Sequence, residues 1–114
     1  MDCIFCKIVN GDIPADIVYE DEEIIAFRDL APQAPVHVLI IPKEHISSLD
    51  DVDASAGHAE LLGRLTAKVS GIAAKLGLNN GYRLVNNCGE DGLQTVQHIH
   101  FHLLGGRKML WPPG

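Results

Sequence analysis

Apolar residues recur with the period of an α-helix in the middle of the chain. Between residues 54 and 76 they are spaced by three and four positions, which places them on one face of a helix. These residues are Leu61, Leu62, Leu65, Val69, Ile72, Ala73 and Leu76. Gly77 follows directly, and glycine commonly ends a helix. The pattern predicts one long amphipathic helix over residues 54–76.

Two shorter features are expected near the N-terminus. Residues 3–9 carry apolar side chains at helical spacing and are followed by an Asn-Gly pair, which predicts a short helix. Residues 17–19 and 24–27 are apolar and flank the acidic residues 20–23, which predicts a β-hairpin. We interpret the acidic residues as a solvated loop.

Three further apolar segments have the character of strands. Residues 36–41 are β-branched, nearly continuous and bounded by prolines, which is typical of a buried strand. Residues 82–87 alternate weakly, whereas residues 97–104 predict a strong final strand. About five strands, one long helix and a short N-terminal helix predict an α+β domain with a mainly antiparallel sheet.

The length and the charge of the chain limit the classes of protein to which it can belong. A chain of 114 residues with 46% hydrophobic and 21% charged residues is expected to form a single domain over residues 1–114. The formal net charge of −6 argues against a partner nucleic acid, because such binding relies on Lys and Arg. No apolar run approaches the roughly 20 residues of a membrane span, and the N-terminus lacks the basic start of a secretory signal. We expect a soluble cytoplasmic protein that does not act at membranes.

Three histidines alternate with apolar residues in the final predicted strand. His98, His100 and His102 would share one face, because successive side chains of a strand point to opposite faces. Imidazole is both a common metal ligand and a nucleophile near neutral pH, so both chemistries remain open from these residues. The groups that could assist a nucleophile there are His37, Asn87 and Thr95.

The cysteines form a second candidate site. Cys3 and Cys6 make a Cys-x-x-Cys pair and leave Cys88 alone, and an odd count does not form a secreted disulfide framework. A redox motif expects a strand before it, whereas this pair precedes every predicted strand. Zinc therefore fits better, and a tetrahedral zinc site needs two more ligands.

The sequence resembles the histidine triad (HIT) family, whose signature alternates three histidines with apolar residues. The matching run is His98-Ile99-His100-Phe101-His102-Leu103-Leu104. The similarity covers almost the whole chain and points to the Hint branch of purine nucleoside phosphoramidases. Further matching segments are residues 3–8, 26–29, 32–46, 105–107 and 111–114, together with Asn87. The resemblance implies a HIT-like α+β fold.

The resemblance implies a chemistry for each polar residue of the triad region. His100 would be the nucleophile and form a nucleotidyl-histidine intermediate that water resolves, with no metal required for the chemical step. His102 and His37 would lie at the phosphate, and Asn87 and Thr95 would hydrogen-bond the phosphate or the leaving group. Relatives commonly have Ser where Thr95 stands, which keeps the hydroxyl. The transferase branch typically carries Gln at the position of His102, so this histidine favours hydrolysis.

The resemblance also implies a purine nucleotide site. Asp29 would hold the ribose hydroxyls, and apolar side chains would surround the base. These side chains belong to Ile4, Phe5, Ile8, Phe27 and Leu30. From the sequence alone, the same apolar residues are equally well assigned to the core.

In bacterial relatives, zinc lies between the cysteine pair, a histidine that follows a Pro-Lys step, and the first triad histidine. The corresponding ligands of one structural zinc ion per chain would be Cys3, Cys6, His45 and His98. Hint-branch proteins are typically homodimers, so we also expect a homodimer that uses the long helix and a sheet edge.

The leading functional hypothesis is hydrolysis of nucleoside 5′-phosphoramidates with release of a purine nucleoside monophosphate. Two alternatives stay open. One is a dinucleoside polyphosphate hydrolase, and the other is a non-catalytic nucleotide-binding or scaffold protein.

Overall fold

The structure is a computed structural model that describes residues 3–114. Met1 and Asp2, which entered the argument against a secretory signal, lie outside the described residues. The helices and strands, in chain order, are α1 (Ile4–Val9), β1 (Ile17–Glu20), β2 (Ile24–Arg28), β3 (Val36–Pro42), two short 3₁₀ helices η1 (Leu49–Asp51) and η2 (Ala54–Ala56), α2 (His58–Lys75), β4 (Tyr82–Asn86) and β5 (Phe101–Gly105). Within this part of the chain, no helix combines the length and apolarity needed to cross a membrane.

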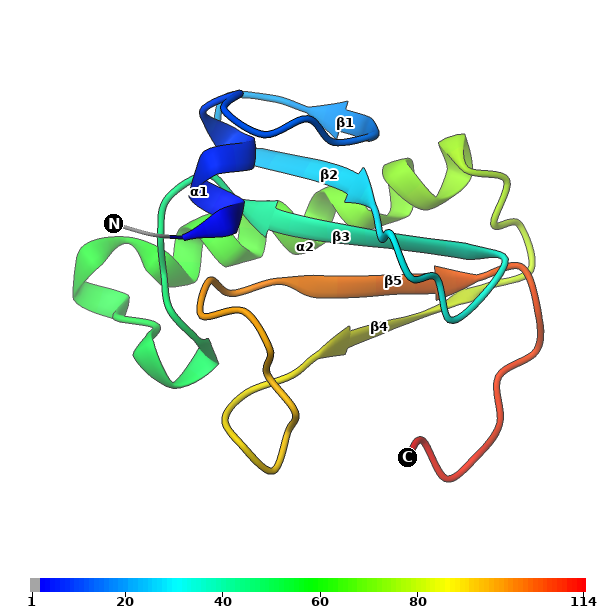
Figure 1. Cartoon of the computed structure of the whole chain (residues 1–114). Helices are drawn as coiled ribbons and strands as arrows, with labels where there is room; N and C mark the ends of the chain where they lie inside the picture. Colours follow the sequence, from blue (N-terminus) through cyan, green and yellow to red (C-terminus); the bar gives the residue numbers. More distant parts are fainter. Residues whose placement is uncertain (1–2) are drawn as a thin grey trace.

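The five strands form one antiparallel sheet, which confirms the predicted α+β fold (Figure 1). Their order is β1-β2-β3-β5-β4, so the last strand lies between β3 and β4. β3 is central, because β2 pairs with it on one side and β5 on the other. His37 on β3 lies opposite Leu104 on β5, which brings the two predicted histidine segments side by side.

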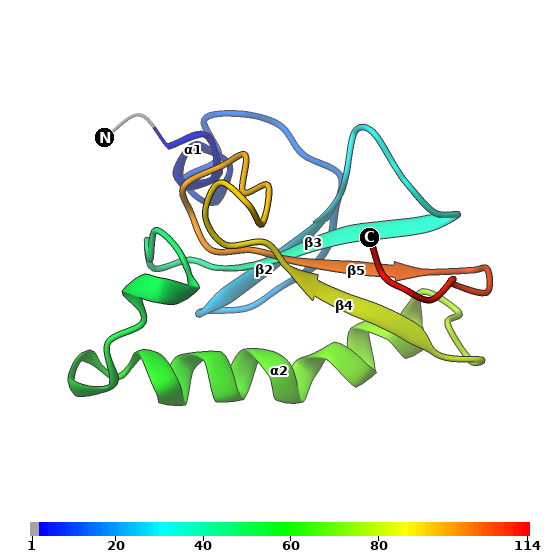
Figure 2. The same cartoon turned by 90° about the horizontal axis from the view of Figure 1, so that it is seen from below.

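The sheet is covered on both faces, which explains the nearly continuous apolar run of β3. Figure 2 shows α2 along one face, and α1 with the loop between β4 and β5 on the other. Ile24 and Ala26 of β2 pack in the cluster with α2, whereas the intervening Ile25 and Phe27 pack in the cluster with α1. Alternate side chains of a strand thus reach different cores, as the pleat requires. α1 is held against the sheet mainly by Phe5 and the residues near it.

The long helix is shorter than predicted. Residues 54–56 form the 3₁₀ turn η2, and α2 begins only at His58, because Gly57 between them has a φ of 77°. That left-handed conformation interrupts a right-handed helix. The helix ends at Lys75, and Gly77 follows with a φ of 78°, in agreement with its predicted role as a stop.

The predicted strand over residues 97–104 is wrong at its beginning, because the ladder starts only at Phe101. Pro42 at the end of β3 has no amide hydrogen with which to continue the pairing. The amide of Ile99 donates to Ile46 O at 2.6 Å, and the carbonyl of His100 accepts from Asn86 Nδ2 at 2.9 Å. His98 and His100 therefore lie in a segment held by loop and side-chain contacts, and only His102 lies in a strand.

The acidic turn between β1 and β2 is more than a solvated loop. Asp21 Oδ1 accepts from the amides of Glu23 and Ile24, and Asp21 Oδ2 lies 2.6 Å from Lys68 Nζ of α2. These contacts hold the pKa of Asp21 far below its usual range, although its partial burial opposes them. The turn thus fastens the hairpin to the long helix.

Candidate functional site

The side chains of residues 98–102 still alternate in direction, although the first three of these residues lie outside β5. His98 and His100 are buried, and both rings form T-shaped contacts with the ring of Phe5, with centroid distances of 5.9 and 5.2 Å. Ile99 between them points to the other side and packs with Leu61 of α2. The three imidazoles share the face of α1, yet they take part in two different clusters.

His100 has a defined tautomer. Its Nδ1 lies 2.8 Å from the carbonyl oxygen of His98, and a carbonyl can only accept a hydrogen bond. Nδ1 therefore carries the proton, and the neutral ring keeps its lone pair on Nε2. A lone pair that is fixed in this way is what a nucleophilic imidazole requires.

His102 and His37 form a hydrogen-bonded chain beside the triad. The amide of Gln33 donates to His37 Nδ1 at 3.0 Å, so the neutral His37 ring must carry its proton on Nε2. That Nε2–H donates to His102 Nδ1 at 2.8 Å. The neutral His102 ring consequently carries its own proton on Nε2 and can donate it.

The carboxylate of Asp29 completes this group, with Oδ2 at 3.5 Å from His37 Nε2. Asp29, His37 and His102 have the composition of a two-histidine, one-carboxylate metal site. Metal binding at His37 Nε2 would move the ring proton to Nδ1, against the amide of Gln33. The contacts therefore favour a hydrogen-bond relay over a metal site.

Burial keeps both histidines of the relay uncharged near neutral pH. It lowers the pKa of His37, with a partial opposing effect from the nearby Asp29 carboxylate. Burial also lowers the pKa of His102 to about 4, and the neighbouring His100 and His37 add to this effect. The tautomers deduced for the neutral rings are thus the relevant ones.

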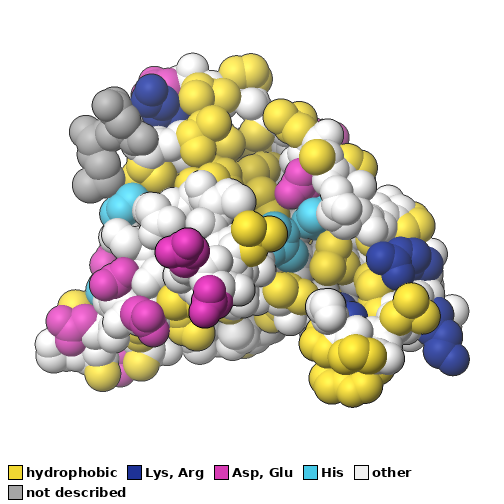
Figure 3. All heavy atoms as spheres, turned by 60° about the horizontal axis from the view of Figure 1, so that its bottom comes forward, with side chains coloured by type: hydrophobic (Ala, Val, Ile, Leu, Met, Phe, Trp, Pro, Cys, Tyr) yellow, Lys and Arg dark blue, Asp and Glu magenta, His cyan; other side chains and the backbone are white. Residues whose placement is uncertain are grey.

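The relay opens onto a cavity of about 270 Å³. Figure 3 shows histidine side chains inside a hollow that has hydrophobic side chains along one wall. Every apolar residue predicted to surround a base lines it, namely Ile4, Phe5, Ile8, Phe27 and Leu30. Asp29, Thr95, His100 and His102 line it as well. The ion pair of Arg28 with Asp16 also belongs to the lining. The structure therefore brings the carboxylate of Asp29, one hydroxyl and two imidazoles together at an apolar cavity.

Two predicted site residues lie outside the lining of this cavity. His37 is buried behind His102 and reaches the site through the hydrogen bond between them. Asn87 uses its Nδ2 to donate to Gly92 O at 2.7 Å and thereby holds the loop between β4 and β5. A larger hollow of about 650 Å³ lies between residues 77–81 and 106–108, but no histidine or cysteine lines it.

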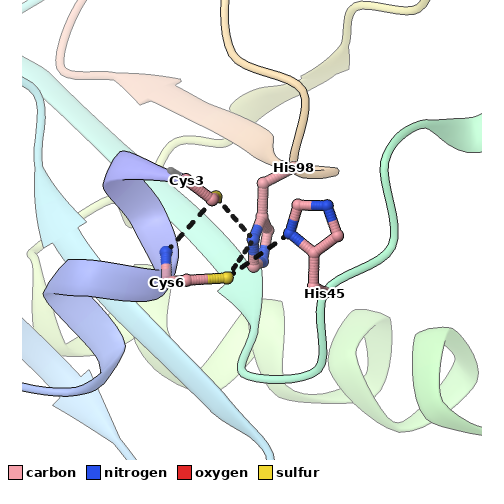
Figure 4. Close-up of side chains that lie close together, drawn as sticks. All are labelled: Cys3, Cys6, His45 and His98. Carbon is pink, nitrogen blue, oxygen red and sulfur yellow. Dashed lines mark hydrogen bonds between the residues drawn. The ribbon is translucent and has the colours of Figure 1, made fainter. Parts of the chain in front are cut away.

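The predicted zinc ligands come together at the N-terminal end of α1 (Figure 4). His98 Nδ1 lies 3.4 Å from Cys3 Sγ and 3.6 Å from Cys6 Sγ, and His45 Nδ1 lies 3.4 Å from Cys6 Sγ. Zinc bonds of 2.0–2.1 Å to nitrogen and 2.3 Å to sulfur give a tetrahedral nitrogen–sulfur edge of about 3.5 Å. The four ligands therefore match the dimensions of a zinc site.

The tautomer of His98 is also the one that a metal ligand requires. His98 Nε2 donates to the carbonyl of Pro42 at 2.8 Å, which leaves the lone pair of Nδ1 facing both cysteines. Burial lowers the pKa of His98 and keeps it neutral. Burial and the neighbouring Cys3 raise the pKa of the Cys6 thiol, so a metal must displace a proton to bind there.

Several residues that organise the two clusters carried no signal in the sequence. The amide of Gln33 and the carbonyl of Pro42 act through the backbone, which any residue type has. The side chain of Asn86 holds the carbonyl of His100 and has a buried Oδ1 without a hydrogen-bond partner. An Asn in a weakly alternating strand gives no indication of such a contact.

The comparisons with known proteins agree with this geometry. The family model for the HIT domain matches residues 10–109. A 14 kDa zinc-binding protein of Brassica juncea is 48% identical over 113 residues, which are 99% of this chain and 100% of the relative. A protein of Arabidopsis thaliana named adenylylsulfatase HINT1 is 47% identical over 111 residues, covering 97% of this chain and 76% of the relative.

A crystal structure of a HIT family hydrolase from Legionella pneumophila has the same fold. The TM-score is 0.94 at 53% sequence identity, and the match covers 99% of this chain and 100% of the other. The chain therefore belongs to the HIT family.

Proposed function

We propose that this protein is a nucleotide hydrolase that cleaves the P–N bond of nucleoside 5′-phosphoramidates through a nucleotidyl-histidine intermediate. The observation that carries the proposal is the contact between His100 Nδ1 and the carbonyl of His98. It leaves the lone pair of Nε2 available beside a cavity that has an apolar wall and the carboxylate of Asp29.

In the first step, His100 Nε2 would attack the α-phosphorus and form a P–N bond to the ring. The bond from phosphorus to the substrate nitrogen breaks, and the departing nitrogen needs a proton. The proton on His102 Nε2 is the one that the relay from Gln33 and His37 makes available. Water then attacks the phosphorus, gives up a proton to His102 Nε2 and breaks the bond to the ring, which releases the nucleoside monophosphate and a neutral His100.

The rest of the cavity would recognise the nucleotide. Asp29 would accept hydrogen bonds from the ribose hydroxyls, and its presence in the lining of the cavity supports this role. The apolar wall is suited to the flat face of a purine base. Thr95 would donate its hydroxyl to the phosphate or to the leaving group, and Asn87 would support the loop that carries Thr95.

The cluster of Cys3, Cys6, His45 and His98 would hold one structural zinc ion per chain. Its dimensions and its deprotonated Nδ1 support this assignment, as does the name of the Brassica relative. The metal would supply no step at phosphorus.

A second substrate class follows from the name of the Arabidopsis relative, which is an adenylylsulfatase. Adenylyl sulfate also has an electrophilic α-phosphorus, but sulfate departs without a proton. Two alternatives from the sequence also remain in view, a dinucleoside polyphosphate hydrolase and a nucleotide-binding protein without turnover.

A substrate panel would test the proposal. It would contain adenosine and guanosine 5′-phosphoramidates, adenylyl sulfate and a diadenosine polyphosphate, with release of the monophosphate as the measurement. We expect the phosphoramidates to turn over fastest, and His100→Ala to lose at least about a thousandfold in rate.

His58→Ala is the matched control, because His58 is paired with Glu44 away from the cavity. It should keep wild-type turnover. Trapping of a labelled nucleotide on the wild-type protein, but not on His100→Ala, would support the covalent intermediate. Retention of most of the turnover by His100→Ala would exclude His100 as the nucleophile.

A further inference from the structure

The two clusters share one residue. His98 contributes Nδ1 to the cysteine and histidine cluster, while its backbone carbonyl accepts the hydrogen bond that fixes the tautomer of His100. A third contact, from Nε2 to the carbonyl of Pro42, ties the same ring to the end of β3. Any rotation of the His98 segment would therefore change both the metal ligand and the partner of the nucleophile.

Phe5 makes a second connection between the clusters. It lies on α1 between Cys3 and Cys6, and its ring meets the ring of His100 edge-on at 5.2 Å and that of His98 at 5.9 Å. Cys3 is the N-cap of this six-residue helix, and its sulfur accepts from the amide of Cys6. Ligation of both cysteines would thus fix the helix that presses Phe5 against His100.

The segment that carries the nucleophile has few other constraints. Residues 96–100 lie outside the sheet ladder. Apart from the carbonyl of His98, their described backbone contacts are those of Val96 with the side chain of Gln94, of Ile99 with Ile46 and of His100 with Asn86. Segments with few backbone hydrogen bonds open locally at low cost in free energy. The position of His100 therefore depends on contacts made through His98 and Phe5.

From these contacts we propose that the metal cluster is a positioning device for the nucleophile, and that Phe5 and the carbonyl of His98 transmit its effect to His100. When the four ligands hold zinc, the Nδ1–H tautomer of His100 is locked and Nε2 is aimed at the cavity. When they do not, the ring samples both tautomers and other orientations. The expected effect on kcat rests on the proposed function, whereas the expected effect on the tautomer of His100 does not.

The first experiment compares zinc-loaded and metal-stripped wild-type protein by NMR of the imidazole nitrogens, with zinc content measured by elemental analysis. We expect His100 to show a protonated Nδ1 and an unprotonated Nε2 in the loaded protein. In the stripped protein, exchange of the Nδ1 proton with solvent should rise about tenfold, and the two tautomers should mix. Readdition of zinc should restore the first spectrum.

The second experiment keeps the metal and removes the connecting ring. Phe5→Leu retains all four ligands and should bind one zinc ion per chain, as the wild type does. We expect its kcat for the phosphoramidate to fall about tenfold and its His100 Nδ1 proton to exchange faster, because a small misplacement of a reacting group is costly. The Phe5→Leu variant tests whether Phe5 positions His100 even if the metal-stripped protein unfolds.

Ile41→Val is the matched control, since Ile41 is buried in the same cluster as Phe5 but makes no ring contact with His100. It should remove one buried methyl group and leave both kcat and the His100 signals unchanged. Identical His100 spectra in the loaded, stripped and Phe5→Leu proteins would overturn the proposal. If no substrate turns over, the proposed function fails, and the imidazole spectra still decide the role of the cluster.

Discussion

Three of the buried imidazoles have one ring nitrogen fixed by a backbone group. His37 accepts from the amide of Gln33, His98 donates to the carbonyl of Pro42, and His100 donates to the carbonyl of His98. Each contact fixes which nitrogen is left for chemistry. The sequence could predict the types and the alternation of these residues, but it could not predict their tautomers, because those depend on which backbone group the fold brings to each ring.

The protonated Nε2 of His102 leads to a prediction about leaving groups. His102→Gln should slow the hydrolysis of a phosphoramidate by about a hundredfold or more, since the departing nitrogen needs a proton. Hydrolysis of adenylyl sulfate should be affected much less, because sulfate leaves as an anion. The ratio of the two rates in the variant and the wild type is the measurement. An equal loss on both substrates would argue against His102 as the proton donor.

The lowered pKa of His102 predicts a loss of stability in mild acid. In the unfolded chain a histidine takes up a proton near pH 6.5, whereas the folded protein resists protonation of His102 down to about pH 4. The unfolded state therefore binds more protons between these values, and folding stability falls as the pH drops through this window.

Urea unfolding at pH 7 and pH 5 would measure this effect. The contribution of His102 to the difference should be about 1 kcal/mol after allowance for its partial exposure to water. His102→Gln should remove that part of the pH dependence, and His58→Gln serves as the comparison. An unchanged pH dependence in His102→Gln would contradict the prediction.

Among the elements, the central strands and the long helix were predicted well, and the errors lie at their ends. The apolar patterns identify β3 because both of its faces are buried, and α2 because one whole face is buried. The start of β5 was missed because a ladder ends where the partner strand lacks an amide hydrogen, as at Pro42. The break before α2 was missed because Gly57 adopts a positive φ that its sequence neighbours do not reveal.

Gly57 supports a prediction about helix initiation. Gly57→Ala should destabilise the protein by about 1 kcal/mol, because a φ of 77° is unfavourable for a residue with a Cβ. Gly63→Ala is the matched control, since Gly63 lies within α2 with open space around it. It should raise the unfolding midpoint slightly, because alanine is the better helix former. Equal effects of the two substitutions would contradict the argument.

For the whole molecule, the order of the strands leaves β4 at one edge of the sheet. Its outer side has no partner strand among the described residues, and the exposed Tyr82 begins it. We propose that this edge, together with α2, forms the homodimer expected from the sequence. Light scattering on the eluted peak should then give twice the chain mass of 12.4 kDa.

Arg83→Glu would test the interface, because Arg83 lies on the edge strand and lines no part of the nucleotide cavity. In a dimer paired through β4, reversing the charge of this side chain on both copies should disturb the contacts across the edge and shift the eluted protein towards the monomer. A wild-type protein that elutes as a monomer at every concentration would exclude the dimer.

The position of β5 in the sheet has a consequence for how the protein is made. β5 is the last strand to leave the ribosome, yet it lies between β3 and β4, so β4 cannot join the sheet before it arrives. The same strand carries His102, and the residues just before it are His98 and His100. Before residues 98–105 are made, the nascent chain therefore holds three strands that can pair, and a cysteine pair that has His45 but lacks His98. Both the fold and the nucleophile are therefore completed together, only once β5 has been made.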